Sequence, residues 1–131
     1  MLDAGCGTGK LANLAPGDYL GLDTDTAAVA RARRRYRCDA RKRFLIADAA
    51  VMDFPANFFD VELVHGIAEP SRASLDAIAR ATQGPIVLVQ PARASLESLR
   101  ASLAHAGLGV DCDEVTREHR ILLCRRGAVR R

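Results

Sequence analysis

A glycine-rich segment near the start of the chain carries the residues with the clearest chemical meaning. Residues 3–9 read Asp-Ala-Gly-Cys-Gly-Thr-Gly, so glycines stand at three alternate positions behind an acid. Glycine accepts backbone angles that other residues avoid, and it lets a ligand contact the main chain directly. The spacing is typical of a strand that turns sharply into a helix. We therefore expect a flat or polar ligand to lie against the backbone of this loop.

Three further polar residues follow segments that read as strands. Doubly wound sheets bind their ligands at the carboxyl ends of strands, so we expect these residues at the same edge as the glycine loop. Two acids in such positions, behind a glycine loop, make a more specific signal than the loop alone. The three residues are Asp23 after residues 19–22, Asp48 after residues 44–47, and His65 after residues 59–64.

Strand-like and helix-like segments alternate along the chain, which predicts an α/β fold with a doubly wound, mostly parallel sheet. The last two strands have no helix between them and therefore form an antiparallel hairpin. The first strand is a stub of residues 1–3. The pattern further predicts strands at 86–89, 110–115 and 119–124, and helices at 10–15, at 27–36 with Thr26 as its cap, at 71–82 and at 94–106.

The composition is that of an ordinary single domain over residues 1–131, with 49% hydrophobic and 27% charged residues. No apolar run approaches the roughly 20 residues of a membrane span, and no signal peptide is visible. The four cysteines form no C-x-x-C pair, which favours reduced thiols in a cytoplasmic protein and neither zinc nor redox chemistry. A disulfide between Cys112 and Cys124 in the terminal hairpin is the alternative.

An arginine-rich stretch at 31–43 stands out in a chain whose net charge is +3. An RNA-binding patch is one interpretation. However, Tyr36 is the single aromatic residue in the stretch, whereas nucleic-acid surfaces interleave aromatic and basic residues. We therefore interpret the stretch as a solvated helix face with its following turn, and we expect no nucleic-acid partner.

Three ligands could use such a glycine loop. A phosphate-binding P-loop is excluded, because Leu11 stands where the motif needs a magnesium-binding hydroxyl. A dinucleotide such as NAD fits residues 7–12 with Asp23 at the expected distance, but it leaves Asp3 without a role. S-adenosylmethionine gives each acid a role: Asp3 faces its ammonium group, Asp23 its ribose hydroxyls, and Asp48 the amine of its adenine.

On four segments the chain resembles a class I S-adenosylmethionine-dependent methyltransferase of the compact, small-molecule type. The resemblance implies a Rossmann-like sheet of seven strands with its last strand inserted antiparallel. It also implies a role for each site residue. Asp3, Gly5 and Gly7 would hold the methionine part, Asp23 the ribose, Thr24 and Ala49 the adenine ring, Asp48 its amine, and His65 would lie near the methionine tail or the substrate. The segments are LDAGCGTG at 2–9, YLGLDTD at 19–25, FLIADAAVMDFP at 44–55 and FFDVELVHG at 58–66.

The chain departs from that family's pattern at three places. The full first strand and a preceding helix that covers the cofactor are missing, Gln83-Gly84-Pro85 replaces a glycine pair, and no sizeable insertion follows Val89. These departures leave a second interpretation open, in which a shortened domain acts as a non-catalytic scaffold or partner subunit.

Methyl transfer from a sulfonium is an in-line displacement, so the protein mainly aligns the reacting groups and excludes water. A general base is needed where the acceptor must lose a proton. His65 and Glu69 are the candidates near the end of the strand at 59–64, and His65 serves equally as a wall of the site.

Overall fold

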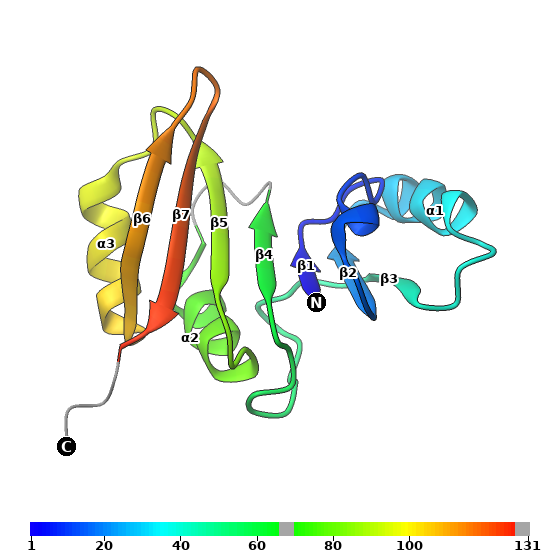
Figure 1. Cartoon of the computed structure of the whole chain (residues 1–131), viewed down its shortest axis with the longest axis horizontal. Coiled ribbons are helices and arrows are strands. Elements are labelled where there is room, and N and C mark those ends of the chain that lie inside the picture. Colours follow the sequence, from blue (N-terminus) through cyan, green and yellow to red (C-terminus); the bar gives the residue numbers. More distant parts are fainter. Residues whose placement is uncertain (66–69, 128–131) are drawn as a thin grey trace.

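The computed structural model describes residues 1–65 and 70–127. Its centre is a sheet of seven strands in the order β3-β2-β1-β4-β5-β7-β6 (Figure 1). Strands β1 to β5 run parallel, and β7 runs antiparallel to both of its neighbours, as the sequence predicted. The strands are β1 Leu2–Ala4, β2 Tyr19–Asp23, β3 Lys42–Ile46, β4 Glu62–His65, β5 Ile86–Pro91, β6 Leu108–Val115 and β7 His119–Arg126.

Three α-helices connect the strands: α1 Thr26–Arg35, α2 Arg72–Ala81 and α3 Leu96–His105. The predicted cap of α1 was wrong by one residue, because the Asp25 carboxylate accepts the amides of residues 27 and 28. The predicted short helix at 10–15 was too long. Its residues form a short 3-10 turn, η1 Ala12–Leu14, since the Pro16 that follows has no amide to extend it.

The first strand is a stub of three residues as predicted, but it lies one residue later than the predicted 1–3, at Leu2–Ala4, between β2 and β4. Leu2 pairs with Leu20 of β2 on one side and with Glu62 of β4 on the other. The backbone bonds continue just beyond the strand, because the Leu2 amide donates to Val61 O at 3.0 Å and the Leu20 amide donates to Met1 O at 3.0 Å. Strand β1 therefore holds the two halves of the sheet together despite its length.

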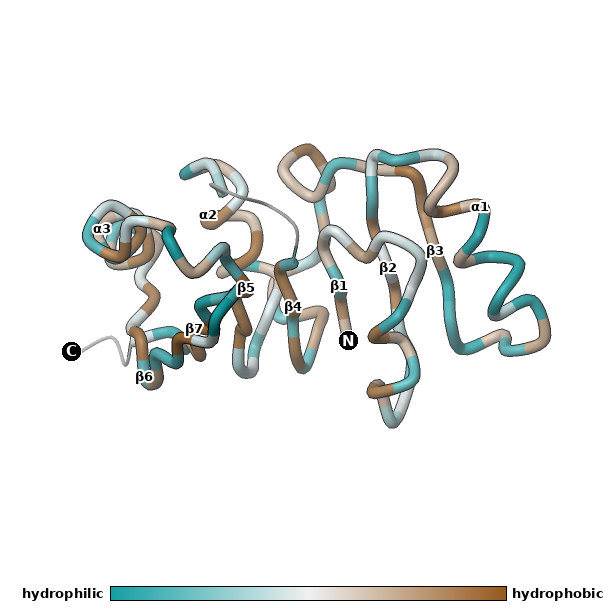
Figure 2. The backbone as a smooth tube through the Cα atoms, turned by 90° about the horizontal axis from the view of Figure 1, so that it is seen from above, coloured by the Kyte–Doolittle hydropathy of each residue, from teal (hydrophilic) through white to brown (hydrophobic). Residues whose placement is uncertain are grey.

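The core lies on both faces of the sheet. Helices α2 and α3 lie together on one side of β5, β7 and β6, and α1 lies beside β2 and β3 at the other end (Figures 1 and 2). Ala4, Val64, Leu88 and Leu122 stand in one row across four strands and are fully buried in the cluster that α2 and α3 cover. A second cluster, including Tyr19 and Phe44, lies beneath α1.

The terminal hairpin forms as expected, but the disulfide considered for it does not. Cys112 and Cys124 are both free; Cys124 is buried in the core while Cys112 is exposed and pairs with Leu123 across the ladder. Within the described residues, no helix is long and apolar enough to cross a membrane.

A buried carboxylic acid opens β4. Glu62 is fully buried, its Oε2 accepts the hydroxyl of Thr82 at 2.5 Å, and its Oε1 has no partner. Burial raises the pKa of Glu62 from 4.5 to about 7, and the Thr82 hydroxyl opposes this rise. The folded chain therefore keeps this proton between pH 4.5 and 7, where the unfolded chain releases it.

We expect the free energy of unfolding to fall as pH rises through this window, by roughly 3 kcal/mol from this group. Glu62→Gln mimics the protonated acid, so the variant should lose this pH dependence and be more stable than the parent above pH 7 by about 2 kcal/mol. Urea unfolding at pH 5 and pH 8 measures both effects. A parallel pH dependence of parent and variant would contradict the assignment.

Candidate functional site

The glycine loop turns back on the end of β2. Gly5, Gly7 and Gly9 have φ angles of +83°, +55° and +75°, which side-chain-bearing residues rarely adopt. The amides of Gly5 and Cys6 both donate to the carbonyl of Leu22, at 2.8 and 3.0 Å. A methyl group added at Gly7 would meet no atom within 4 Å, so the loop backbone is open on that side.

Asp23 is in direct contact with this loop. Its Oδ2 accepts the amide of Gly7 at 2.8 Å, and its Oδ1 accepts the amide of Asp25 at 2.9 Å. The carboxylate is half-buried at the last position of β2. The structure thus joins two elements that the sequence analysis could relate only by their expected places at strand ends.

Asp3 lies behind the loop and is 1% exposed. Its Oδ2 accepts the hydroxyl of Tyr19 at 2.5 Å, while its Oδ1 is buried without a hydrogen-bond partner. Burial raises the pKa of Asp3, and the Tyr19 hydroxyl and the nearby His65 act in the opposite direction. An unpaired oxygen on a buried acid is costly, so a cationic donor at this position would be strongly favoured.

Tyr19 contacts the candidate site residue Asp3 and was not selected by the sequence analysis. Strand β2 places it on the same face as Gly21, and Gly21 is the β-partner of Asp3. Burial and the adjacent Asp3 raise the pKa of Tyr19, which therefore remains a proton donor. Alternation along β2 gives the face of Tyr19, but the contact also requires the register of β1 against β2.

The adenine candidates lie at the same edge of the sheet as the glycine loop: Thr24 follows β2, and Asp48 and Ala49 follow β3. The amide of Ala47 donates to the Asp23 carbonyl at 3.0 Å, which ties the end of β3 to the end of β2. The Asp48 carboxylate is exposed and accepts the amide of Ala50 at 2.9 Å, without a bond to Asp23 or the loop. Thr24 is exposed and Ala49 is half-buried.

His65 is the last residue of β4 and is half-buried. Its effect on the Asp3 pKa places it near that carboxylate. Its ring centroid is 6.3 Å from that of His119, which begins β7 and which the sequence analysis did not select. The other candidate base, Glu69, lies outside the described residues.

Cys6 lies within the loop, and burial raises the pKa of its thiol to about 12. It therefore stays protonated, and its side chain packs in the cluster beneath α1. The residues described by the structure contain no group of three side chains that could hold a metal ion.

The sheet order, the glycine loop after the central strand and the acids at the next strand ends define a Rossmann-like methyltransferase fold. The chain belongs to the methyltransferase domain family, whose model matches residues 1–83. The family and fold that the sequence resembled are therefore confirmed, and neither the dinucleotide nor the scaffold alternative is favoured. A comparison with curated protein sequences gives no match.

Solved structures support the fold. The chain is similar to a TehB-like SAM-dependent methyltransferase from Corynebacterium glutamicum, with 22% identity, a TM-score of 0.79, and coverage of 96% of this chain and 79% of the other. Magnesium protoporphyrin IX methyltransferase from Synechocystis, with bound SAM, gives 22% identity and a TM-score of 0.75. The match covers 96% of this chain and 69% of that enzyme. For geranyl diphosphate C-methyltransferase from Streptomyces coelicolor, the sequence identity is 14% and the TM-score is 0.83. The match covers 96% of this chain and 70% of that enzyme.

Proposed function

We propose that the chain binds S-adenosylmethionine at the carboxyl edge of β1 to β4 and transfers its methyl group to a small molecule. The observation that carries the proposal is the bond from the Gly7 amide to Asp23 Oδ2, which brings the loop and the β2 acid to one place. Membership of the methyltransferase family supports it. Two compared structures hold the donor or its product S-adenosylhomocysteine.

The free oxygen of Asp3 suits the ammonium of the methionine part, because a buried acceptor without a partner gains most from a charged donor. Gly5 and Gly7 would line that part with their main chain. Asp23 would accept the ribose hydroxyls with the lone pairs that remain beside its two backbone bonds.

The adenine would lie against the ends of β2 and β3. Thr24 and Ala49 would flank its ring, and Asp48 would accept from its exocyclic amine. The exposed carboxylate of Asp48 accepts one hydrogen bond, from the amide of Ala50, and therefore has free acceptor positions for the adenine amine.

The bound donor supplies an activated methyl group on a positively charged sulfur. The chain's contribution is then alignment and exclusion of water. His65, at the end of β4, would form a wall beside the methionine part or take a proton from the acceptor.

The acceptor is expected to be a small molecule. Two of the compared enzymes, by their names, methylate magnesium protoporphyrin IX and geranyl diphosphate. Here four residues, 92–95, separate β5 from α3, which leaves little room for a larger recognition element. We further propose that residues 1–131 act as a single domain in the cytoplasm, which the four free cysteines support.

Calorimetry with S-adenosylhomocysteine and with NAD tests the proposal. We expect saturable binding of the first and none of the second. Tight binding of NAD would favour the dinucleotide interpretation, and no heat with either compound would favour the scaffold.

Tyr19→Phe should weaken binding of S-adenosylhomocysteine by about tenfold, and the loss should be greater at the acidic end of the pH range in which the protein is folded than at the basic end. In the parent protein the Tyr19 hydroxyl lowers the pKa of Asp3. Without this hydroxyl, Asp3 stays protonated up to a higher pH and loses its attraction for the ammonium. Titrations across this pH range measure the change.

Tyr36→Phe is the matched control. The Tyr36 ring packs against the same cluster, but its hydroxyl donates to the Gly9 carbonyl at 2.9 Å and contacts no acid. Identical pH profiles for the two variants would contradict the role given to Tyr19.

A further inference from the structure

Two histidines from distant parts of the chain meet at the carboxyl edge of the sheet. His65 ends β4 and His119 begins β7, and their ring centroids are 6.3 Å apart. Strands β4, β5 and β7 lie side by side, and this edge is the one that carries the glycine loop (Figure 1). Among the residues that the structure describes, neither imidazole has a hydrogen-bond partner. The methyl transfer proposed above gives no role to His119.

The backbone holds His119 in place from two sides. The Thr116 hydroxyl oxygen accepts the His119 amide at 3.0 Å, and the Thr116 amide donates to the His119 carbonyl at 2.7 Å. The Ala92 amide donates to the Glu118 carbonyl at 2.9 Å, which ties the hairpin turn to the segment after β5. His119 is also the register partner of Pro91, the last residue of β5. The position of its ring opposite His65 is therefore built into the fold.

Aliphatic side chains lie next to the two imidazoles. His65, Val89 and Ile121 are register partners in one row across β4, β5 and β7. His119 stands two residues before Ile121, so alternation along the strand places it on the same face. Val89 and Ile121 are half-buried. A pair of polar rings beside an aliphatic surface suits a ligand with an apolar body and one polar group.

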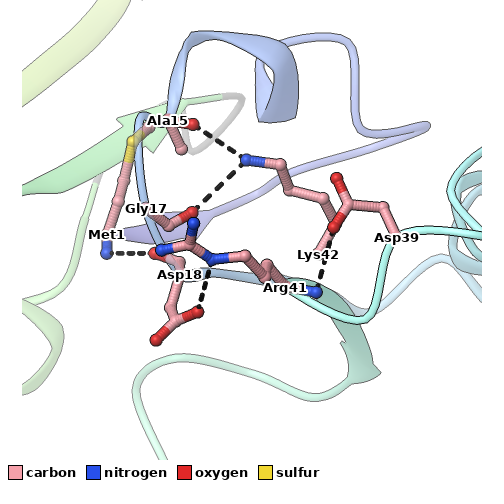
Figure 3. A network of polar contacts seen from close by, with 7 residues as sticks. All are labelled: Met1, Ala15, Gly17, Asp18, Asp39, Arg41 and Lys42. Carbon is pink, nitrogen blue, oxygen red and sulfur yellow. Dashed lines mark hydrogen bonds and ion pairs between the residues drawn. The ribbon is translucent and has the colours of Figure 1, made fainter.

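Several cations of the chain are engaged away from this pair. Arg120 follows His119, but it lies on the other face of the sheet, where its Nε is 3.2 Å from Asp113 Oδ1. At the amino edge of the sheet, Arg41 pairs with Asp18 and Lys42 donates to two backbone carbonyls (Figure 3). An uncharged polar group therefore suits the histidine pair better than an anion does.

We infer that His65 and His119 together bind the hydroxyl group of a phenolic methyl acceptor, whose ring lies against Val89 and Ile121. This inference rests on the methyl transfer proposed above. A neutral imidazole has one donor and one acceptor nitrogen, and a hydroxyl group also donates and accepts. At the observed separation of the rings, one oxygen can form a hydrogen bond of about 2.9 Å with a nitrogen of each.

The chemistry of the transfer favours a phenol over an alkyl alcohol. A phenol has a pKa of about 10, as the tyrosine side chain does, so an imidazole can take its proton as the oxygen attacks. The oxygen then forms a bond to the methyl carbon while the bond from that carbon to sulfur breaks, and the electron pair of the broken bond stays on sulfur. The hydroxyl proton passes to the imidazole. His119 is exposed and can release this proton to water.

The chain contains three histidines, so the ring signals of all of them can be assigned by nuclear magnetic resonance with one variant each. We expect para-ethylphenol to shift the signals of His65 and His119 saturably. His105, the last residue of α3, should not respond and serves as the internal control. The titration is made both with and without saturating S-adenosylhomocysteine.

Two analogues with the same apolar body test the polar group. In para-ethylanisole the hydroxyl proton is replaced by a methyl group, so this compound can accept a hydrogen bond but cannot donate one. It should bind at least about fivefold more weakly than para-ethylphenol. The anion para-ethylbenzoate should also bind more weakly. This arm tests Arg93 and Arg117, which are exposed in the turns after β5 and before β7.

His119→Gln should weaken binding of para-ethylphenol by about tenfold, because one of the two hydrogen bonds to its oxygen is lost. Binding of S-adenosylhomocysteine should stay unchanged in calorimetry, since His119 has no part in the proposed donor site. His105→Gln is the matched control and should change neither affinity.

The inference is overturned by any of four results: no shift at His65 and His119, an equal shift at His105, binding of either analogue as tight as that of the phenol, or unchanged phenol affinity in His119→Gln. A protein that binds no S-adenosylhomocysteine but shows the two histidine shifts without it would contradict the proposed methyl transfer alone. The two proposals therefore fail in distinguishable ways.

Discussion

Asp23→Ala is expected to weaken binding of S-adenosylhomocysteine by about 100-fold or more, because the two charge-assisted hydrogen bonds proposed between its carboxylate and the ribose would be lost together. The change also removes the acceptor of the Gly7 amide, so the loop loses its anchor to the end of β2. Calorimetric titration of the purified variant measures the affinity.

Two companion variants separate these contributions. Asp23→Asn keeps an acceptor for the Gly7 amide but loses the charge, so its affinity should lie between those of parent and alanine variant. Asp25→Ala removes a neighbouring acid that caps α1, which should cost about 1 kcal/mol of stability and leave the affinity unchanged. Binding by Asp23→Ala at the parent's affinity would remove Asp23 from the site.

Gly84→Ala is expected to lower the free energy of unfolding by about 3 kcal/mol. A methyl group at this position would lie 1.9 Å from the carbonyl oxygen of Asp60, which belongs to the backbone and cannot rotate away. The chain must therefore shift where Phe59 and Gln83 are bonded through their main chains at 2.9 Å.

Gly109→Ala provides the control for this prediction. The nearest atom to an added methyl there is the Arg125 carbonyl oxygen at 3.9 Å, an ordinary contact. Urea unfolding of both variants should show a large loss for Gly84→Ala and a small change for Gly109→Ala. Equal midpoints would mean that the backbone at Asp60 yields easily.

Much of the fold could be predicted from local pattern. Helix α2 begins after Ser71 and ends before Thr82, where the sequence placed its limits, because an apolar face and a capping serine are both local signals. The cap of α1 was misjudged between two adjacent residues that can both cap. The helix predicted at 10–15 was too long for a different reason. The segment between the glycine loop and Pro16 is too short for an α-helix, and it forms one 3-10 turn.

The candidate site was predictable only in part. Glycine spacing and strand-terminal acids indicated the loop and Asp23, and the structure brings these into contact. The Tyr19–Asp3 bond joins two strands, so it requires the register of the sheet. The stacking of Phe54 on Phe58 also could not be foreseen, because these residues belong to a segment without periodicity whose position is set by tertiary packing.

The short β1 has a consequence for the order of folding. Its pairing with β2 closes a short loop, whereas its pairing with β4 must wait for a much longer stretch of chain to be gathered, at a greater entropic cost. We therefore expect β1, β2, α1 and β3 to assemble early and the β1–β4 seam to form late. The β1–β4 pairing rests on the three residues of β1, so the native protein should also open first between β1 and β4.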